Sequence, residues 1–519
     1  MVMGVRELRI FLQCCRKKKV DMDYFEEFLK IQEEFAQTVD NKKTVYIQKM
    51  RDIAQRCSEE QKIYIYSYII DIANDEKAAF QLIGLALKSD ELSIETKYFI
   101  YNQIKSLQFR GKISGLENDV NNEYLLYMVI DSFKEKLHNY LTFIPRERRN
   151  SKLALIITSQ FLSTGHGPTK SALARCAALK KAGREVLLIN TAELQPWVGS
   201  VPFYNAFFGV YNENHLEVEY MEWNEVKVPF FQCENNMPDI ETYKCVLETV
   251  QNIKPEYAVE IGGGSILASL VNECIPVLSV GMVPSSIGEF TTDYCTLGRR
   301  LNDNDRQKIK KLGKREEHVI EHKFTSDLIK QEQLVTRKML GISKDAFILA
   351  VVGARLSYEA DNKFFDMLEC VAEEEDITIM MLGYFDREDE VKQKYPALSE
   401  KIIFEGFKHD ILAYLGVCNL YVNPIRTGGG TSCVEAMQKG LPVVTTGNGD
   451  VAVNAGEGFI TENYETMQKL IVRYKKDNDF YRKQSELALL RAGELQDTEK
   501  AFIELIEEFL EREEKYGRK

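Results

Sequence analysis

The sequence predicts an α/β protein in which two doubly wound parallel-sheet domains follow an all-helical region. At 519 residues the chain is too long for one hydrophobic core. The first 147 residues contain one proline and four glycines and carry apolar residues at helical spacing. After residue 150, apolar strand-like segments alternate with helical ones, which is typical of parallel sheets. We expect a helical domain, two α/β domains and a C-terminal helix, at residues 1–147, 150–340, 341–495 and 496–519.

The helical region is expected to form a stack of helical hairpins. Its apolar spacing is clearest at Phe25, Phe28, Ile31 and Phe35. A pattern of tyrosine and isoleucine recurs at irregular intervals, at residues 62–69, 97–104 and 123–130. Each hairpin must bury its apolar stripe against a neighbour, which favours an array. Such an array offers a surface for protein partners, and a plain bundle that supports the rest of the chain is the alternative.

Two series of buried strands follow the polar hinge at residues 145–150. The first is expected at 153–158, 185–190, 258–261 and 277–280, and the second at 347–352, 378–382, 402–404, 420–422 and 443–445. We expect the charged segment 299–344 to join the two units. Because ligands bind beyond the carboxyl ends of parallel strands, a cleft between the two units is the predicted site.

Composition restricts the class of protein. A formal net charge of −12 argues against a nucleic-acid surface, and no window of 18 apolar residues predicts a membrane span, so we expect a cytoplasmic protein. The eleven cysteines are scattered without a C-x-x-C pair and are expected to be reduced. His318 and His322 are assigned to the exposed face of a charged helix. No metal site and no bound cofactor are predicted.

The most informative segment runs from Asn423 to Val444 and reads as strand end, glycine loop, helix start, acidic residue and strand. A triple glycine leaves backbone N–H groups open to a phosphate, and the helix expected to begin at Thr431 and Ser432 adds its positive end. Glu435 could accept hydrogen bonds from ribose hydroxyls. The alternative is a capping box formed by Ser432 and Glu435, with the glycines serving a tight turn.

The first α/β unit carries a comparable loop at residues 164–170, beyond its first strand. Pro168 suits the first turn of a helix, and the flanking glycines let a ligand approach. His166 could act as a base, an acid or a hydrogen-bond donor, or be merely exposed. The turn Gly262–Ser265 is expected to line the acceptor side of the same cleft. An aromatic group could wall the acceptor site or belong to the core or a lid: Trp197, Phe203, Tyr204, Phe207 and Phe208.

Three motifs in this order resemble those of GT-B glycosyltransferases, particularly family 4: residues 352–356, 404–408 and 428–442. The resemblance covers about residues 150 to 515. It implies two Rossmann-like domains that hold a nucleotide sugar in the cleft between them. The helical region also resembles the arrangement in protein glycosyltransferases of the O-GlcNAc transferase and high-molecular-weight adhesin type.

The resemblance implies transfer of a sugar from a nucleotide diphosphate donor, a UDP-sugar by expectation, to a peptide or protein acceptor without a metal ion. Arg355 and, at a longer spacing than usual, Lys363 match the family's diphosphate clamp. The catalytic candidates are His166, Arg355 and Lys363. The donor-binding candidates are Gly165, Gly167, Arg426, Gly428, Gly429, Gly430, Thr431, Ser432 and Glu435.

One departure from the family pattern leaves alternatives open. Thr427 stands where the family has the first of two glutamates, so Arg426 or the glycine backbone could hold the sugar instead. The sugar, the acceptor, the stereochemical outcome and the oligomeric state do not follow from the sequence. Transfer to a glycan or lipid-linked acceptor and a non-catalytic binding subunit are the alternative functions, and a homo-oligomer or partner subunit is compatible with either. The triplet Asp303–Asp305 is assigned to a helix start in the linker rather than to a metal site.

Overall fold

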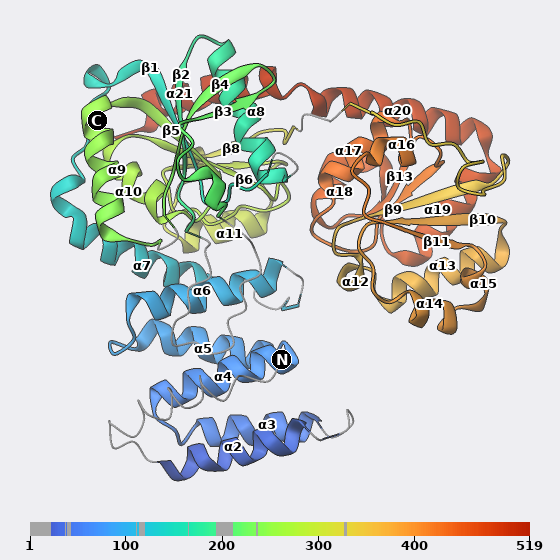
Figure 1. Ribbon diagram of the computed structural model, residues 1–519, viewed down its shortest axis with the longest axis horizontal. Helices are drawn as coiled ribbons and strands as arrows, with labels where there is room; N and C mark the ends of the chain where they lie inside the picture. The colour runs from blue at the N-terminus through green and yellow to red at the C-terminus, as the bar shows by residue number, and fades with distance from the viewer. Residues whose placement is uncertain are drawn as a thin grey trace.

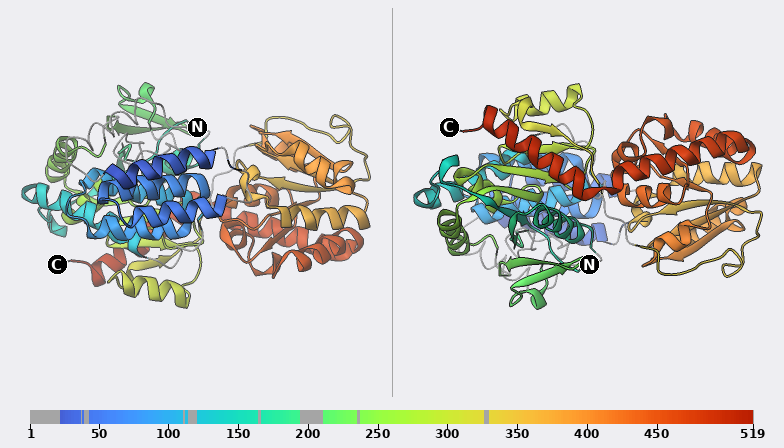
Figure 2. Two further views of the ribbon diagram at one scale, coloured as in Figure 1. Left: turned by 90° about the horizontal axis from the view of Figure 1, so that it is seen from below. Right: turned by 90° about the horizontal axis from the view of Figure 1, so that it is seen from above.

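The computed structural model describes residues 22–36, 38, 43–109, 112–113, 120–163, 166–193, 211–234, 237–325 and 330–518. Two α/β domains lie side by side, and a stack of helices lies beneath the first of them (Figure 1). Two further views show the helical stack running along one face of the first α/β domain (Figure 2). The predicted fold class, two Rossmann-like domains after an all-helical region, is confirmed.

The helical stack consists of consecutive helices that pack pairwise: α2 Met22–Ala36, α3 Lys43–Ala54, α4 Glu59–Ala73, α5 Glu76–Lys88, α6 Ile94–Phe109 and α7 Asn121–Leu137. Aromatic side chains hold the first pairs together, since the Tyr64 ring meets Phe25 and Phe28 edge-on at centroid distances of 5.5 and 5.9 Å. Two tyrosine hydroxyls fasten the stack to the first α/β domain. Tyr98 donates to the carbonyl of Glu193 at 2.9 Å, and Tyr127 donates to that of Phe290 at 2.8 Å.

The first α/β domain is built on an eight-stranded sheet in the order β3-β4-β2-β1-β5-β6-β7-β8. All neighbours are parallel except β3 and β4. The strands are β1 Asn150–Thr158, β2 Glu185–Asn190, β3 Tyr220–Trp223, β4 Val226–Gln232, β5 Pro255–Gly262, β6 Val277–Gly281, β7 Tyr294–Leu297 and β8 Val319–Glu321. Helices α8 Gly167–Lys181, α9 Ile240–Ile253, α10 Ile266–Cys274 and α11 Asp303–Lys311 complete the domain. The order reverses beside β1, so the loops after β1 and β5 flank a switch point.

The second α/β domain contains a six-stranded parallel sheet in the order β11-β10-β9-β12-β13-β14. Its strands are β9 Phe347–Val352, β10 Ile377–Leu382, β11 Ile402–Gly406, β12 Leu420–Val422, β13 Val443–Thr446 and β14 Ile460–Thr461. Its helices are α12 Leu356–Glu359, α13 Asn362–Glu374, α14 Glu388–Lys394, α15 Pro396–Ser399, α16 Ile411–Leu415, α17 Gly430–Gln438, α18 Gly449–Ala455, α19 Tyr464–Lys476 and α20 Asn478–Gln496. The order corresponds to the Rossmann sequence 3-2-1-4-5-6, with a switch point between β9 and β12.

Part of the segment expected to join the two domains belongs to the first of them. Helix α11 begins at Asp303 with Asn302 as its N-cap, which confirms the helix start, and β8 then extends the first sheet. The assignment of His318 and His322 to an exposed helical face is wrong. His318 ends a short 3-10 turn, is buried, and packs on the Tyr294 ring at 4.5 Å. Tyr294 of strand β7 covers His318, although the surrounding sequence is charged.

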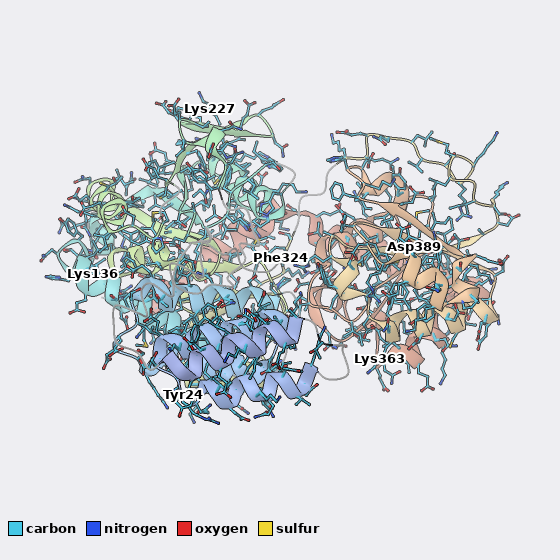
Figure 3. The ribbon with its side chains drawn as sticks, turned by 60° about the horizontal axis from the view of Figure 1, so that its bottom comes forward. Tyr24, Lys136, Lys227, Phe324, Lys363 and Asp389 are labelled. Atoms are coloured by element: carbon cyan, nitrogen blue, oxygen red, sulfur yellow. The ribbon has the colours of Figure 1, made fainter. Side chains whose placement is uncertain are left out.

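The chain returns to the first domain at its C-terminal end. Helix α20 covers the second domain, and α21 Thr498–Tyr516 packs on α8 of the first (Figure 1). Arg175 of α8 lies over the rings of Phe324 and Phe502, both at 5.5 Å, and Figure 3 shows Phe324 between the domains. No helix in the described ranges is long and apolar enough to cross a membrane.

Candidate active site

The glycine loop singled out by the sequence lies where the second domain meets a loop of the first domain that was not singled out. After β9 the chain supplies Arg355, and after β12 it supplies the glycine loop and the start of α17. From the first domain, the loop after β6 reaches across. The hydroxyl of Ser285 donates to Asp450 Oδ1 of α18 at 2.9 Å, and its N–H donates to the same oxygen at 3.3 Å. The site is therefore lined by both α/β domains.

Glu359 joins Arg355 to Arg426. Arg355 donates through Nε and Nη2 to Glu359 Oε1 at 3.0 and 2.8 Å, and Arg426 Nη1 donates to Oε2 at 2.8 Å. Burial acts to raise the pKa of Glu359, but the two guanidinium groups outweigh it and hold that pKa below its usual value. The Arg355 guanidinium also lies against Gly428, where a side-chain carbon would come within 3.0 Å of Nη2. Arg355 thus borders the glycine loop.

Arg426 is part of the wall of the site. Its side chain is 2% exposed, and the guanidinium also donates to Asn423 Oδ1, the Val352 carbonyl and the Tyr421 hydroxyl, at 2.7, 2.7 and 3.1 Å. These contacts tie the end of β9 to the end of β12. The structure places Arg426 beneath the loop, where protein groups occupy its donors, and not on the open side of the cleft.

Neighbouring side chains also require glycine in the loop. Gly429 has a φ of 98°, a left-handed conformation that favours glycine, and a side-chain carbon there would collide with Arg426. A carbon on Gly430 would lie 2.8 Å from Asn454 Nδ2. Space for Arg426 and Asn454, as well as access for a ligand, therefore depends on these glycines.

Helix α17 begins at Gly430, earlier than the predicted start at Thr431 and Ser432. The capping-box alternative is wrong, because the N-cap is Gly429 and no side chain caps the helix. The Ser432 hydroxyl instead donates to the carbonyl of Gly429 at 2.9 Å. The first N–H groups of a helix have no partner within it, and Thr431 is exposed at this end. An uncapped helix start beside Arg355 is suited to bind a phosphate group.

Two acids near the site have raised pKa values. Burial raises the pKa of Glu435 to about 7, while the charge of Lys170 acts in the opposite direction. Burial raises the pKa of Asp450 to about 6, opposed by its hydrogen bonds from Ser285. Acids with pKa values displaced toward neutrality are common in functional sites. Lys170 belongs to α8, so the first domain contributes a charge to the Glu435 side of the cleft.

His166 is the N-cap residue of α8 and is half-buried. Its Nδ1 lies 3.1 Å from Thr169 Oγ1, which also accepts from the N–H of Leu162 at 2.9 Å. Burial first, and then Lys170, lowers the pKa of His166, so its imidazole is neutral at neutral pH. A neutral imidazole held by one ring nitrogen can take up a proton.

Some predicted site residues lie apart from this group. Lys363 is exposed near the start of α13, and Figure 3 shows it at the edge of the second domain. Gly167 is the first residue of α8, beside His166. Gly165 lies outside the described residues, as do the aromatic residues from Trp197 to Phe208.

A group of buried carboxylates beneath the loop Gly262–Gly264 was not predicted. Glu193 accepts from the Tyr243 hydroxyl at 2.5 Å and from the N–H of Leu267 at 2.9 Å. Glu260 accepts from the N–H of Ser265, and burial raises its pKa to about 7. A glutamate inside an apolar strand is the signal that could have identified Glu260, whereas the loop glutamates Glu193 and Glu289 give no such pattern.

The helical stack contributes to this end of the first domain. Lys105 of α6 forms an ion pair with the buried Glu289, and Tyr101 lies 3.2 Å from where a side-chain carbon on Gly264 would stand. After α6, Lys112 lies 5.1 Å from the ring centre of Tyr358 in the second domain. Helical stack, first domain and second domain thus meet near the cleft.

Exposed aromatic rings shortly after strands β9, β10 and β11 were also missed. Tyr358, Tyr384 and Phe407 are 63%, 66% and 65% exposed, and the last two follow Gly383 and Gly406 at strand ends. Their sequence positions after strands could have identified them. Rings exposed at the carboxyl edge of a sheet can stack on a ligand's planar group.

The comparisons with known proteins agree with this geometry. Residues 347–477 match the family described as glycosyl transferases group 1, so the second α/β domain is a glycosyl transferase group 1 domain. The match contains Arg355, the glycine loop and Glu435. No curated protein matched the chain.

Solved structures show that the fold is that of GT-B glycosyltransferases. A glycosyltransferase from Rickettsia africae ESF-5 is 12% identical with a TM-score of 0.52, over 70% of this chain and 99% of that one. A point mutant of the Thermobaculum terrenum O-GlcNAc transferase is 11% identical with a TM-score of 0.50, over 94% of this chain and 98% of that one. The second match extends across the helical stack.

Proposed function

We propose that this protein transfers a sugar from a nucleotide diphosphate donor, a UDP-sugar, to a hydroxyl or amide group of a peptide or protein. The observation that carries the proposal is the meeting of Arg355 with the uncapped start of α17 at the switch point of a group 1 domain. A helix start and a guanidinium group both favour a diphosphate. We assign Glu435, one turn into the helix, to accept hydrogen bonds from the ribose hydroxyls.

In the proposed reaction, the bond between the anomeric carbon and the diphosphate oxygen breaks, and a bond from that carbon to the acceptor oxygen or nitrogen forms. The leaving nucleoside diphosphate gains negative charge, which Arg355 and the α17 N–H groups stabilise without a metal ion. The acceptor proton must pass to a base. His166 is the candidate because its imidazole is neutral and stands at the start of α8, beyond the carboxyl end of β1.

A protein acceptor is favoured by the helical stack. The stack is fastened to the first domain by Lys105 and Tyr98, and Lys112 brings it to the second. The fold of the chain resembles that of an O-GlcNAc transferase. This likeness supports a protein acceptor held between the helices and the cleft. We assign the protein to the cytoplasm, in keeping with its eleven scattered cysteines, which suit a reducing compartment.

A second function, a non-catalytic binding subunit, is favoured by Thr427. This residue stands in the place of the family's glutamate, is exposed, and offers its carbonyl to the N–H of Asp450 at 2.7 Å. A hydroxyl cannot replace a carboxylate as a charged partner of the donor. The pocket could then bind a nucleotide sugar without catalysing its transfer.

The test is binding and turnover across a panel of UDP-, GDP- and ADP-sugars. Binding is measured by calorimetry, donor cleavage by released nucleotide, and transfer by mass increments on a peptide library. Arg355→Ala and Glu435→Ala are compared with Arg482→Ala, which removes an arginine that is 70% exposed on α20. We expect one donor class to bind and turn over, and Arg355→Ala to lower kcat/KM by on the order of 10²–10³. Binding without turnover would favour the subunit, and no binding would refute both functions.

A further inference from the structure

Asp450 of α18 joins the glycine loop of the second domain to the first domain. Its N–H donates to the carbonyl of Thr427 at 2.7 Å, immediately before Gly428. A side-chain carbon on Gly430 would lie 3.1 Å from Asp450 Cβ. The Asp450 carboxylate accepts from the hydroxyl and the N–H of Ser285 at 2.9 and 3.3 Å. This carboxylate is therefore fixed beside the loop by groups from both domains.

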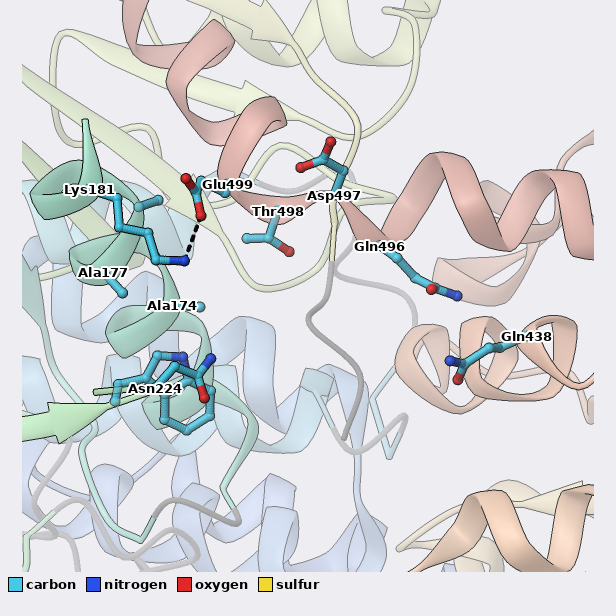
Figure 4. Close-up of a pocket in the computed structure, with 11 residues that line it drawn as sticks. Ala174, Ala177, Lys181, Asn224, Gln438, Gln496, Asp497, Thr498 and Glu499 are labelled. Atoms are coloured by element: carbon cyan, nitrogen blue, oxygen red, sulfur yellow. Dashed lines mark hydrogen bonds and ion pairs between the residues drawn. The ribbon is translucent and has the colours of Figure 1, made fainter. Parts of the chain in front are cut away.

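The first domain meets helix α17 differently at its two ends. A cavity of about 360 Å³ is lined by residues of α8 and by the end of α17, and Figure 4 shows Ala177 and Gln438 on opposite sides of it. Asp450 lies at the other end, against Gly430, the first residue of α17. The contact between Ser285 and Asp450 therefore brings the first domain to the helix start, where we place the phosphate groups of the donor.

One oxygen of the Asp450 carboxylate has no hydrogen-bond partner in the described part of the chain. Both hydrogen bonds from Ser285 go to Oδ1, and no described residue donates to Oδ2. Asp450 is 6% exposed, so little bulk water reaches the side chain. Burial raises its pKa to about 6, so most of the carboxyl is ionised at pH 7 and can only accept hydrogen bonds. A buried oxygen without a hydrogen bond destabilises the site, and a hydroxyl group of a ligand would supply the missing donor.

The sugar of the donor is the part of the ligand that can reach this oxygen. In a nucleotide sugar, the sugar is bonded directly to the diphosphate. Arg355 Nη2 would lie 3.0 Å from a side-chain carbon on Gly428, and Asp450 borders Gly430, two residues further along the same loop. Thr427, just before the loop, offers no carboxylate to the sugar. Asp450 therefore provides a carboxylate next to the diphosphate site.

We propose that Asp450 is a donor-binding residue: its Oδ2 accepts a hydrogen bond from a hydroxyl group of the donor sugar, while Ser285 of the first domain holds Oδ1. This inference rests on the proposed function. It supplies from α18 the carboxylate that is absent at Thr427. It also makes the site selective, because a site built to hydrogen-bond a hydroxyl group discriminates against an analogue that lacks it.

The experiment measures by calorimetry the affinity of UDP and of its sugar derivatives for wild type and for Asp450→Asn. The derivatives are UDP-glucose and UDP-N-acetylglucosamine, and then deoxy analogues of whichever binds more tightly, each lacking one hydroxyl group. Asparagine keeps the side-chain shape and one acceptor oxygen for Ser285. The matched control is Asp479→Asn, which neutralises an aspartate whose side chain is 82% exposed on α20.

We expect Asp450→Asn to bind the sugar nucleotide about 10- to 100-fold more weakly, the loss typical of a hydrogen bond to a charged group, with its UDP affinity unchanged. Asp479→Asn should match wild type for both ligands. The analogue without the contacted hydroxyl group should bind wild type more weakly than the parent by a similar factor, whereas Asp450→Asn should bind the two about equally.

The other outcomes separate the inference from the proposed function. Equal weakening of UDP and of the sugar nucleotide in Asp450→Asn would show that Asp450 only shapes the loop. Unchanged affinity for both ligands, or discrimination among the analogues like that of wild type, would show that Asp450 does not contact the sugar. Each of these results overturns the inference and leaves the proposed function standing. Wild type that binds neither UDP nor a sugar nucleotide would refute the proposed function, and the inference with it.

Discussion

Replacing Arg426 by methionine should destabilise the second α/β domain far more than replacing Arg355. Arg426 is 2% exposed and donates hydrogen bonds to Asn423, Val352 and Tyr421 that link β9 to β12, besides its ion pair with Glu359. Methionine fills much of the volume but makes none of these contacts. Glu359, whose side chain is 10% exposed, therefore loses one of its two guanidinium partners.

The magnitude follows from the burial of that ion pair. Removing one partner of a buried pair typically costs about 3–5 kcal/mol. For a domain of this size, about 2–4 °C is lost for each kcal/mol, so the melting temperature of the second domain should fall by about 6–20 °C. Arg355 is 24% exposed and pairs with Glu359 one helical turn away, so Arg355→Met should cost about 1 kcal/mol or less.

The assay is calorimetric unfolding at several pH values, with donor binding measured separately on folded protein. The lowered pKa of Glu359 contributes stability that is present above its unfolded value of 4.5 and is lost as the pH falls through the folded value. The deficit of Arg426→Met should therefore be larger at pH 7 than near pH 4. Unfolding like that of wild type, combined with donor affinity as weak as in Arg355→Met, would show that Arg426 serves the ligand and refute the structural role.

Three further outcomes are expected. His166→Gln should lower kcat by about 10²–10⁴-fold with donor affinity unchanged, as measured by steady-state kinetics and calorimetry; equal kcat would exclude His166 as the base. Asp450→Asn should stabilise the protein by up to about 3 kcal/mol above pH 6 and leave its stability unchanged near pH 3.8. Burial raises the pKa of Asp450 from 3.8 to about 6, so ionisation of this carboxyl costs the folded state free energy. A stability difference that does not vary with pH in denaturant titrations would contradict this. Transfer activity should persist in excess EDTA, and its loss with recovery on adding Mg²⁺ or Mn²⁺ would refute the metal-independent reaction.

Elements with strong local patterns were predictable from the sequence. Strands β2, β9 and β12 occupy the predicted ranges, because each is a short and largely apolar run followed directly by a polar residue or glycine. Short strands were not predicted. Strand β8, for example, has three residues inside a charged stretch and becomes a strand by pairing with β7. The start of α17 was misplaced because Gly429, in a left-handed conformation, is the N-cap, whereas the sequence pattern of Ser432 and Glu435 suggested a cap further along the chain.

The sequence by itself determined the fold class, the two switch-point loops and the residue types that suit a diphosphate, since these depend on periodicity and on glycine and charge within a few positions. Tertiary structure decided which of those residues can meet a ligand. It places Arg355 beside the helix start, Arg426 beneath the loop and Lys363 at the outer surface. It also brings Ser285 of the first domain into hydrogen-bond contact with Asp450 of the second. Burial and proximity between distant segments determine ionisation and access, and neither is encoded in any local pattern.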